Sequence, residues 1–288
     1  MEGEEKLWAS STEMTIDEIV RIVRIGVKLG ISKVKLTGGE PLMREGIVEI
    51  VKRIAAVRGL TDLSMTTNGA RLASLAEELH ANGLQRINIT LPTVREELYR
   101  KLTGGSVEPV LDGVKAAVKA GFCPVKLNML VLKDMNDRAV PEMIELAGET
   151  GTILQLIELE PVNISEVYYS RHHRSLEEYE DALKERAIRV ETRQYMQNRR
   201  IYHLPNATIE VIRPVENADF CMHCTRLRVT SDGKLKPCLM VKDNLVDVLT
   251  PLRNGANDEE LMALFGLANQ KRQPYAEEKE PYQVVLTD

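Results

Sequence analysis

Three of the four cysteines in this 288-residue chain lie between residues 221 and 238. Cys221 and Cys224 form a C-x-x-C pair, and Cys238 follows after 13 intervening residues. Between them, Asp232-Gly233 is flanked by alternating apolar and polar residues, which is a strong hairpin signal. Such a hairpin returns Cys238 to the neighbourhood of Cys224. Because grouped thiolates bind zinc or an iron–sulfur cluster, the spacing predicts a metal site with three thiolate ligands.

The cysteines by themselves leave the metal open. A structural zinc ion normally has four protein ligands, and the candidates for a fourth are His223, inside the C-x-x-C, and the distant Cys123. A [4Fe–4S] cluster on three thiolates keeps one iron free for a small molecule. Buried cysteines that hold no metal are the third interpretation. Of the three, we favour the cluster.

Two arginines, Arg226 and Arg228, directly follow the C-x-x-C and are two residues apart, so they share a face of the first predicted hairpin strand. Guanidinium groups grip phosphate oxygens bidentately, so the pair suits a phosphate-bearing ligand beside the metal. A solvated edge strand is the alternative.

The elements upstream must position a ligand for these groups. Five predicted strands, residues 33–37, 62–67, 86–91, 124–132 and 153–160, are separated by predicted helices. This alternation predicts a parallel sheet, most simply a partial or complete β/α barrel. The pattern starts with a helix, capped by Thr15 and Glu18, whereas such barrels usually start with a strand. We therefore expect either a capping helix or a first strand upstream of Met1.

Beyond residue 162 the pattern changes, which predicts a barrel domain over 1–162 and a C-terminal region over 163–288 that carries the cysteines. In the second region we expect one exposed helix over 170–188 preceded by a polar loop, extended edge-like structure over 202–212, and the hairpin. Two helices are expected to follow, near 244–253 and 258–269.

Composition excludes several classes of protein. The net charge of −5 argues against general nucleic-acid binding, and no apolar run is long enough to span a bilayer. The acidic N-terminus resembles neither a signal nor a transit peptide. Three crowded cysteines do not form a secreted disulfide framework, so we expect a cytoplasmic protein.

Polar motifs occur on consecutive predicted strands. "KLTGGEPLMR" (35–44) has two glycines and a glutamate where the first strand leaves the sheet, and "TTNG" (66–69) ends the next strand. "NIT" (88–90), "KLN" (126–128) and "ELE" (158–160) lie on the following three. Such residues in a barrel converge on one pocket.

The stretches "TGGEPL", "TTNG", "PVKLN" and "FCxxCxRxRxTxDGxLxPCL" together resemble the MoaA family, the radical S-adenosylmethionine (SAM) GTP 3',8-cyclases of molybdenum cofactor biosynthesis. The resemblance runs from about Thr15 to beyond Leu239. It implies an incomplete β/α radical SAM barrel and a lyase that converts GTP to 3',8-cyclo-7,8-dihydro-GTP. It also implies a SAM-cleaving cluster near the N-terminus and a substrate-binding cluster near the C-terminus, with a pterin synthase as the next enzyme.

Position by position, the resemblance implies three groups of site residues. The substrate-side [4Fe–4S] cluster is assigned to Cys221, Cys224 and Cys238. GTP is assigned to Lys35, Thr66, Lys126, Arg226 and Arg228. The SAM pocket is assigned to Gly39, Glu40, Thr90 and Glu160.

The chain departs from the family pattern in identifiable places. The N-terminal C-x-x-x-C-x-x-C that holds the SAM-cleaving cluster does not occur in these 288 residues, and Gln155 stands where arginine is frequent. We expect the chain to begin downstream of that motif and, as it stands, not to carry out the radical reaction. A missing strand would expose sheet edges, which favours pairing into a homodimer. The competing hypotheses are a non-catalytic nucleotide-binding or zinc-stabilised barrel, and another radical SAM enzyme with an auxiliary cluster.

Overall fold

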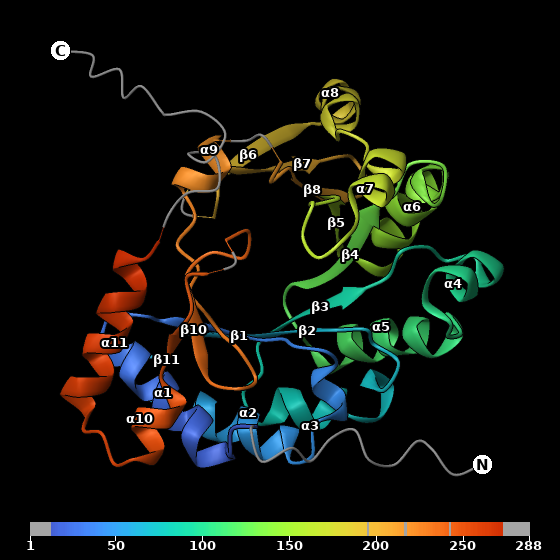
Figure 1. The fold of residues 1–288 in the computed structure, drawn as a ribbon. Helices are drawn as coiled ribbons and strands as arrows, with labels where there is room; N and C mark the ends of the chain where they lie inside the picture. Colours follow the sequence, from blue (N-terminus) through green and yellow to red (C-terminus); the bar gives the residue numbers. More distant parts are fainter. Residues whose placement is uncertain (1–12, 195, 216–217, 242, 273–288) are drawn as a thin grey trace, which may run out of the picture. The chain divides into compact units, whose positions relative to one another are not determined.

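The computed structural model describes residues 13–194, 196–215, 218–241 and 243–272 (Figure 1). The chain divides into two compact units. One, which we call the terminal unit, contains Met1–Val34, Arg53–Asp62 and Arg226–Asp288. The other, the sheet unit, contains Lys35–Lys52 and Leu63–Thr225. The predicted division between residues 162 and 163 stays a prediction.

The main sheet has eight strands in the order β1-β2-β3-β4-β5-β8-β7-β6 in the described residues. Their bounds are β1 Lys33–Leu36, β2 Asp62–Thr67, β3 Arg86–Thr90, β4 Val125–Val131, β5 Ile153–Glu158, β6 Arg189–Arg193, β7 Arg199–His203 and β8 Thr208–Ile212. Strands β2 to β5 and β8 pair in parallel, whereas β6 and β7 are antiparallel. The order is open, with β1 and β6 at its ends, which confirms the predicted incomplete β/α barrel.

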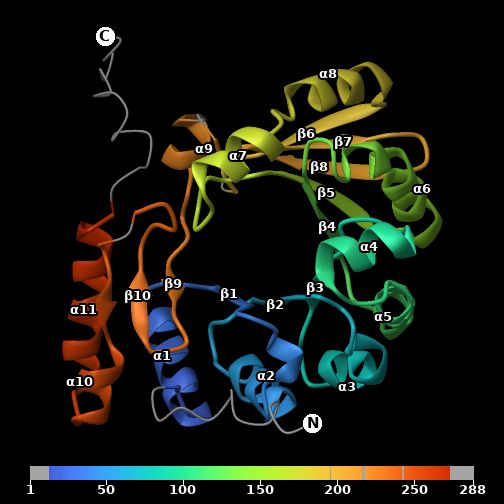
Figure 2. The same ribbon diagram turned by 45° about the vertical axis from the view of Figure 1, so that its right-hand side comes forward.

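Helices cover the outer face of this curved sheet, as Figure 2 shows for α4, α5 and α6. The helices of the sheet unit are α3 Ala76–Ala81, α4 Glu96–Thr103, α5 Glu108–Ala120, α6 Val140–Thr150, α7 Glu166–His172, α8 Glu177–Arg186 and α9 Ala218–Met222. Short 3-10 turns lie at η1 Pro41–Met43, η2 Leu72–Ser74 and η3 Asp137–Ala139, and α2 Ile47–Ala55 begins in this unit. Helix α6 begins with Pro141 in its first turn and ends at Gly151, whose φ of 66° suits a left-handed cap. Local sequence therefore sets both ends of this helix.

Each strand of the sheet separates two faces. On β4 and β5, alternate apolar residues such as Leu127 and Leu156 are fully buried under the helices. The residues between them, which include Lys126 and Gln155, point to the opposite, inner face. Because side chains on both faces are buried, these strands read as nearly continuous apolar runs interrupted by a few polar residues.

The terminal unit packs two helical layers against a small sheet. It contains α1 Ile16–Lys28, the strands β9 Arg228–Val229, β10 Lys234–Lys236 and β11 Val246–Asp247, and the helices α10 Leu249–Arg253 and α11 Asp258–Gln270. Its core is apolar and includes Ile25, Leu235 and Phe265. Thr15 and Glu18 form the predicted capping box at the start of α1. Strands β9 and β10 pair antiparallel around Gly233, at φ 71°, so the predicted hairpin is confirmed.

Three predictions for the C-terminal region were wrong. Residues 170–188 form parts of two helices, α7 and α8, because α7 ends at His172 and the backbone of His173 is extended. The stretch 202–212 is not at an edge, since β8 lies between β5 and β7. Residues 246–247 form strand β11 rather than the start of a helix, because their backbone pairs with β10.

No helix among the described residues is both long and apolar enough to cross a membrane.

Candidate functional site

The loop after β1 is fastened to the loop after β2 by the carboxylate of Glu40. It accepts hydrogen bonds from the Thr67 hydroxyl (2.6 Å), the Asn68 backbone N–H (2.6 Å) and the Leu42 backbone N–H (3.0 Å). The loops that contain "GGEP" and "TTNG" are therefore linked to each other at the ends of the neighbouring strands β1 and β2. Glu40 was predicted to lie near the SAM amino group, and its observed donors hold it at this end of the sheet.

The other predicted SAM residues occupy loops and strand ends of the same unit. Gly38 and Gly39 precede Glu40, and a Cβ added to either would meet nothing within 4 Å, so their backbone is open to a ligand. Thr90 is exposed at the end of β3, and Glu160 is half-buried after β5. Ligands of parallel α/β sheets bind at these carboxyl ends, and the residues present fit SAM in that respect.

A row of polar side chains crosses the inner face of the sheet. The register pairs Thr66 with Asn88 and Asn88 with Lys126, and it pairs Gln155 with Glu210. Asn88 Nδ2 donates to Gln155 Oε1 (2.8 Å), and Gln155 Nε2 donates to Glu210 Oε2 (2.5 Å). The row therefore continues through side-chain hydrogen bonds from β3 to β8.

At the centre of this row, the Lys126 ammonium forms an ion pair with Glu210 Oε2. The Lys126 side chain is 5% exposed and that of Glu210 is 0% exposed. Burial lowers the pKa of Lys126, and the attraction of Glu210 offsets only part of that effect. Burial alone would raise the pKa of Glu210, but Lys126, Arg199 and Arg193 outweigh it and lower this pKa to about 2. The Glu210 carboxylate is therefore ionised at neutral pH.

Two arginines from the β6–β7 hairpin approach the same carboxylate. Arg193 Nη1 lies 3.5 Å and Arg199 Nη1 3.7 Å from Glu210 Oε1. Sequence reasoning missed Glu210 and both arginines. The one available signal was a charged residue within the apolar run "TIEVI".

The remaining predicted substrate residues are more exposed. Lys35 is exposed on β1, and Thr66 is half-buried on β2. In the terminal unit Arg228 is half-buried on β9, opposite Lys236, whereas Arg226 is exposed and precedes the strand. The prediction that both arginines lie on the first hairpin strand is therefore right for Arg228 only, because pairing with β10 begins at that residue.

The cysteines divide between the two units. Cys221 and Cys224 belong to the sheet unit, at the end of α9, where the Cys224 N–H donates to the Cys221 carbonyl (3.1 Å). Cys238 belongs to the terminal unit. All three are half-buried, as thiolate ligands reachable by a cluster must be. Among the described residues, no three His, Cys, Asp or Glu side chains are arranged to hold a metal ion, so the grouping of the three thiols stays a prediction.

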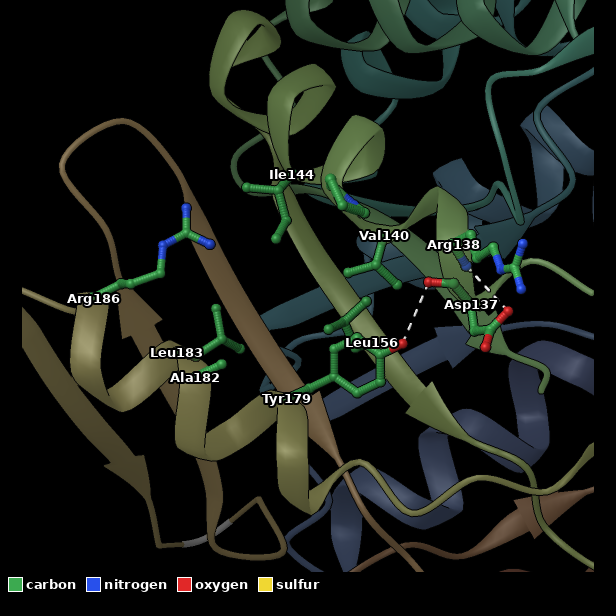
Figure 3. Close-up of a pocket in the computed structure, with 10 residues that line it drawn as sticks. Asp137, Arg138, Val140, Ile144, Leu156, Tyr179, Ala182, Leu183 and Arg186 are labelled. Atoms are coloured by element: carbon green, nitrogen blue, oxygen red, sulfur yellow. Dashed lines mark hydrogen bonds between the residues drawn. The ribbon is translucent and has the colours of Figure 1, made fainter. Parts of the chain in front are cut away.

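The sheet unit also contains a cavity of about 520 Å³ on its outer face, between α6 and α8 (Figure 3). Its wall is mainly apolar and includes Ile144, Leu156 and Leu183. The Tyr179 hydroxyl donates to the Asp137 carbonyl (3.3 Å) at one side. None of the predicted site residues lines it, because they project from the other face or from the strand ends.

Family models match most of the chain. The Radical SAM superfamily model matches residues 5–147, and the Molybdenum Cofactor Synthesis C model matches residues 152–278. The solved structure of Streptococcus suis SuiB is similar in fold, with a TM-score of 0.59 and 16% sequence identity. That match covers 79% of this chain and 54% of SuiB.

Curated relatives are much closer in sequence. A probable GTP 3',8-cyclase of Thermococcus kodakarensis is 47% identical over 273 residues, covering 92% of this chain and 88% of the relative. The probable GTP 3',8-cyclase of Methanocaldococcus jannaschii is 43% identical, with 91% and 86% covered. The two family models and these relatives agree. The chain therefore belongs to the radical SAM GTP 3',8-cyclase (MoaA) family of molybdenum cofactor synthesis.

Proposed function

We propose that this protein is a GTP 3',8-cyclase, a lyase of the class that converts GTP to 3',8-cyclo-7,8-dihydro-GTP with the help of SAM. These 288 residues contain no C-x-x-x-C-x-x-C to hold the SAM-cleaving cluster, so by themselves they are expected not to carry out the radical reaction. The observation that carries the proposal is the row of polar residues on the inner face of the sheet, in a chain 47% identical to a probable GTP 3',8-cyclase. Outside a ligand site, four polar side chains would rarely be joined across the middle of a buried sheet.

In this proposal the strand ends of the sheet unit hold SAM. The open backbone of Gly39 lets the ligand approach closely, while Glu40 fixes the loop through Thr67 and Asn68. Thr90 and Glu160 supply polar groups from the ends of β3 and β5. Bound SAM would supply the radical chemistry, and the chain's own residues would bind and orient the ligands and exclude water.

GTP is assigned to Lys35, Thr66, Lys126, Arg226 and Arg228. Lys126 supplies an amine at the centre of the inner face, where Glu210 holds it and is itself held by a hydrogen bond from Gln155. The two terminal-unit arginines offer planar donors for phosphate or purine oxygens. Cys221, Cys224 and Cys238 would hold a [4Fe–4S] cluster, which supplies an open iron for the purine.

Further parts of the proposal concern context. A cytoplasmic location follows from the reduced thiols that a cluster needs, and a pterin synthase would consume the product. A homodimer is proposed from the exposed strands at the ends of the sheet order.

The experiment is anaerobic reconstitution of the 288-residue chain with iron and sulfide, followed by iron analysis and EPR of the reduced protein with and without GTP. The proposal expects one [4Fe–4S] cluster whose signal shifts with GTP. Cys238→Ser should abolish both the iron and the shift, whereas the matched variant Cys123→Ser should change neither, because Cys123 lies outside the motif.

Two outcomes would contradict the proposal. About one equivalent of tightly bound zinc and no cluster would favour the zinc-stabilised barrel. A cluster whose EPR signal does not change when GTP is added would favour another radical SAM activity.

A further inference from the structure

Glu210 is a fully buried carboxylate at the centre of the inner face, and both of its oxygens face cations. Its Oε2 accepts hydrogen bonds from the Lys126 ammonium and from Gln155 Nε2 (2.5 Å). Its Oε1 receives no hydrogen bond from the described residues, and Arg193 Nη1 and Arg199 Nη1 lie 3.5 Å and 3.7 Å from it. Because its side chain is 0% exposed, Glu210 acts on a ligand only through these neighbours.

The Lys126 amine has hydrogen-bonding capacity to spare. A protonated lysine carries three N–H donors, and Glu210 is the one hydrogen-bond partner of Lys126 in the part of the chain that the structure describes. The side chain is 5% exposed, so water reaches these donors poorly. Buried donors in proteins are nearly always satisfied. The remaining donors of Lys126 therefore suit the acceptor oxygens of a ligand on the inner face.

Glu210 also stands between Lys126 and two like charges. Lys126 faces Arg193 from β6, Arg199 from β7 and Glu210 from β8. Burial lowers the pKa of Lys126 and the two arginines lower it further, whereas Glu210 opposes them. Without Glu210 the amine would lose its proton at a lower pH, and with it the charge that attracts an anion.

The same carboxylate fixes the direction of the amide groups in the polar row. An ionised carboxylate only accepts hydrogen bonds, so Gln155 must turn its amide nitrogen toward Glu210 and its Oε1 away from it. That oxygen accepts from Asn88 Nδ2 (2.8 Å), and the same nitrogen donates to Asn128 Oδ1 (3.2 Å). Asn128 therefore turns its oxygen toward Asn88 and keeps its amide N–H groups for other acceptors.

We propose that Glu210 is the positioning residue of the inner face, which holds the Lys126 ammonium and the amide row with their N–H donors toward a ligand. A row that offers a cation and N–H donors selects oxygen-rich, anionic ligands, such as a phosphorylated sugar or nucleotide. The inference deepens the proposed function, on which it rests for the identity of that ligand as GTP.

The first measurement needs no ligand. Lysine side chains of the 288-residue chain are isotope-labelled, the Lys126 signal is identified by its loss in Lys126→Met, and its titration is followed by NMR. We expect Glu210→Gln to move the midpoint of this titration down by at least about 1 pH unit, as for the loss of an opposite charge in contact. The matched control Glu185→Gln, the same change on an exposed residue of α8, should leave the midpoint unchanged.

The second measurement is GTP binding by calorimetry between about pH 7.5 and 9.5, where the phosphate chain keeps its charge because phosphate monoesters titrate near pH 6. Deprotonation of Lys126 removes an attraction, so the affinity falls as the pH rises. We expect this fall to begin at a lower pH in Glu210→Gln than in the parent chain. It should reach about tenfold, the effect of one charge-assisted hydrogen bond.

Two double variants separate the two parts of the proposal and remove the buried pair as a whole, so that no unpaired member of it is left. Lys126→Met/Glu210→Gln should bind GTP within about twofold of Lys126→Met, because glutamine still accepts from Gln155 and the charge effect needs Lys126. Lys126→Met/Glu210→Met offers Gln155 no oxygen and should bind GTP more weakly. Equal binding by the two double variants would overturn the role given to the amide row.

The inference is overturned if Glu210→Gln leaves the Lys126 titration unchanged, or if Glu210→Gln weakens GTP binding as much in Lys126→Met as in the parent chain. A parent chain that binds no GTP overturns the proposed function instead. The ligand-free titration of Lys126 then decides by itself whether Glu210 positions this amine.

Discussion

Replacing Glu210 by glutamine removes the one carboxylate at the centre of the inner polar row. Its side chain is 0% exposed and pairs with Lys126, whose side chain is 5% exposed. Glutamine has almost the same shape and can still accept a hydrogen bond, so the change isolates the charge. Lys126 would then stay buried beside two arginines without its counter-ion.

The magnitude follows from the pKa of Glu210, which falls from an ordinary value of 4.5 to about 2. A depression of that size corresponds to about 3 kcal/mol of stability at neutral pH. Removing one partner of a buried ion pair independently costs about 3–5 kcal/mol. We therefore expect Glu210→Gln to lower the free energy of unfolding by about 3 kcal/mol.

The same pKa sets the pH dependence. Because the folded pKa lies below the unfolded one, the contribution of Glu210 is fully present above pH 4.5 and is lost as the pH falls toward 2. The difference between the parent chain and Glu210→Gln should be constant from pH 7 to pH 5.5. By pH 3 it should shrink to about 1 kcal/mol.

The assay is urea denaturation followed by circular dichroism at these pH values. The double variant Lys126→Met/Glu210→Gln serves as the control, since it removes both members of the pair and should recover part of the loss. A cost below about 1 kcal/mol for Glu210→Gln at pH 7, or a cost that does not change with acid, would refute the account of a buried ion pair.

Four further substitutions test separate parts of the molecule. Gly113→Ala should lower the free energy of unfolding by about 1–3 kcal/mol and thus the melting temperature, because the new Cβ would lie 2.5 Å from the Gly69 carbonyl oxygen. Gly266→Ala in α11, where an added Cβ meets nothing within 4 Å, should instead raise the free energy of unfolding by about 0.5–1 kcal/mol. Leu235→Ala, at 0% exposure in the terminal unit, should cost about 2–5 kcal/mol in urea titrations, and a smaller loss would argue against this core. Glu40→Gln should cost about 1–3 kcal/mol and weaken SAM binding in equilibrium dialysis; unchanged SAM affinity would remove its loop from the site.

Local signals in the sequence predicted most individual elements correctly. The run 62–67 is strand β2, and the capping box at Thr15 starts α1. Asp232-Gly233 forms the turn of the β9–β10 hairpin. Gly233 adopts the positive φ that the turn needs, and the backbone hydrogen bonds that close the turn join residues three or four positions apart. Such features depend on short-range backbone preference and on the period of apolar residues, both of which are written in adjacent positions.

Prediction failed where distant segments meet. The order β5-β8-β7-β6 joins residues about fifty positions apart, and no local pattern tells β8 to enter the sheet ahead of β6. The break between α7 and α8 likewise depends on His173, whose ring Nε2 lies 2.9 Å from Glu158 on β5. The sequence pattern there is equally compatible with one continuous helix.

The candidate site shows the same division. By itself, the sequence determined which residue types are present and their spacing: three cysteines, the glycine loop at 38–39, and polar residues at successive strand ends. Only the tertiary structure decided that Lys126 faces Glu210, 84 positions away, and that Arg199 lies behind the same carboxylate. The physical reason is that a charge is buried only where packing brings it an opposite charge, and that pairing is set by strand order rather than by neighbours in the chain.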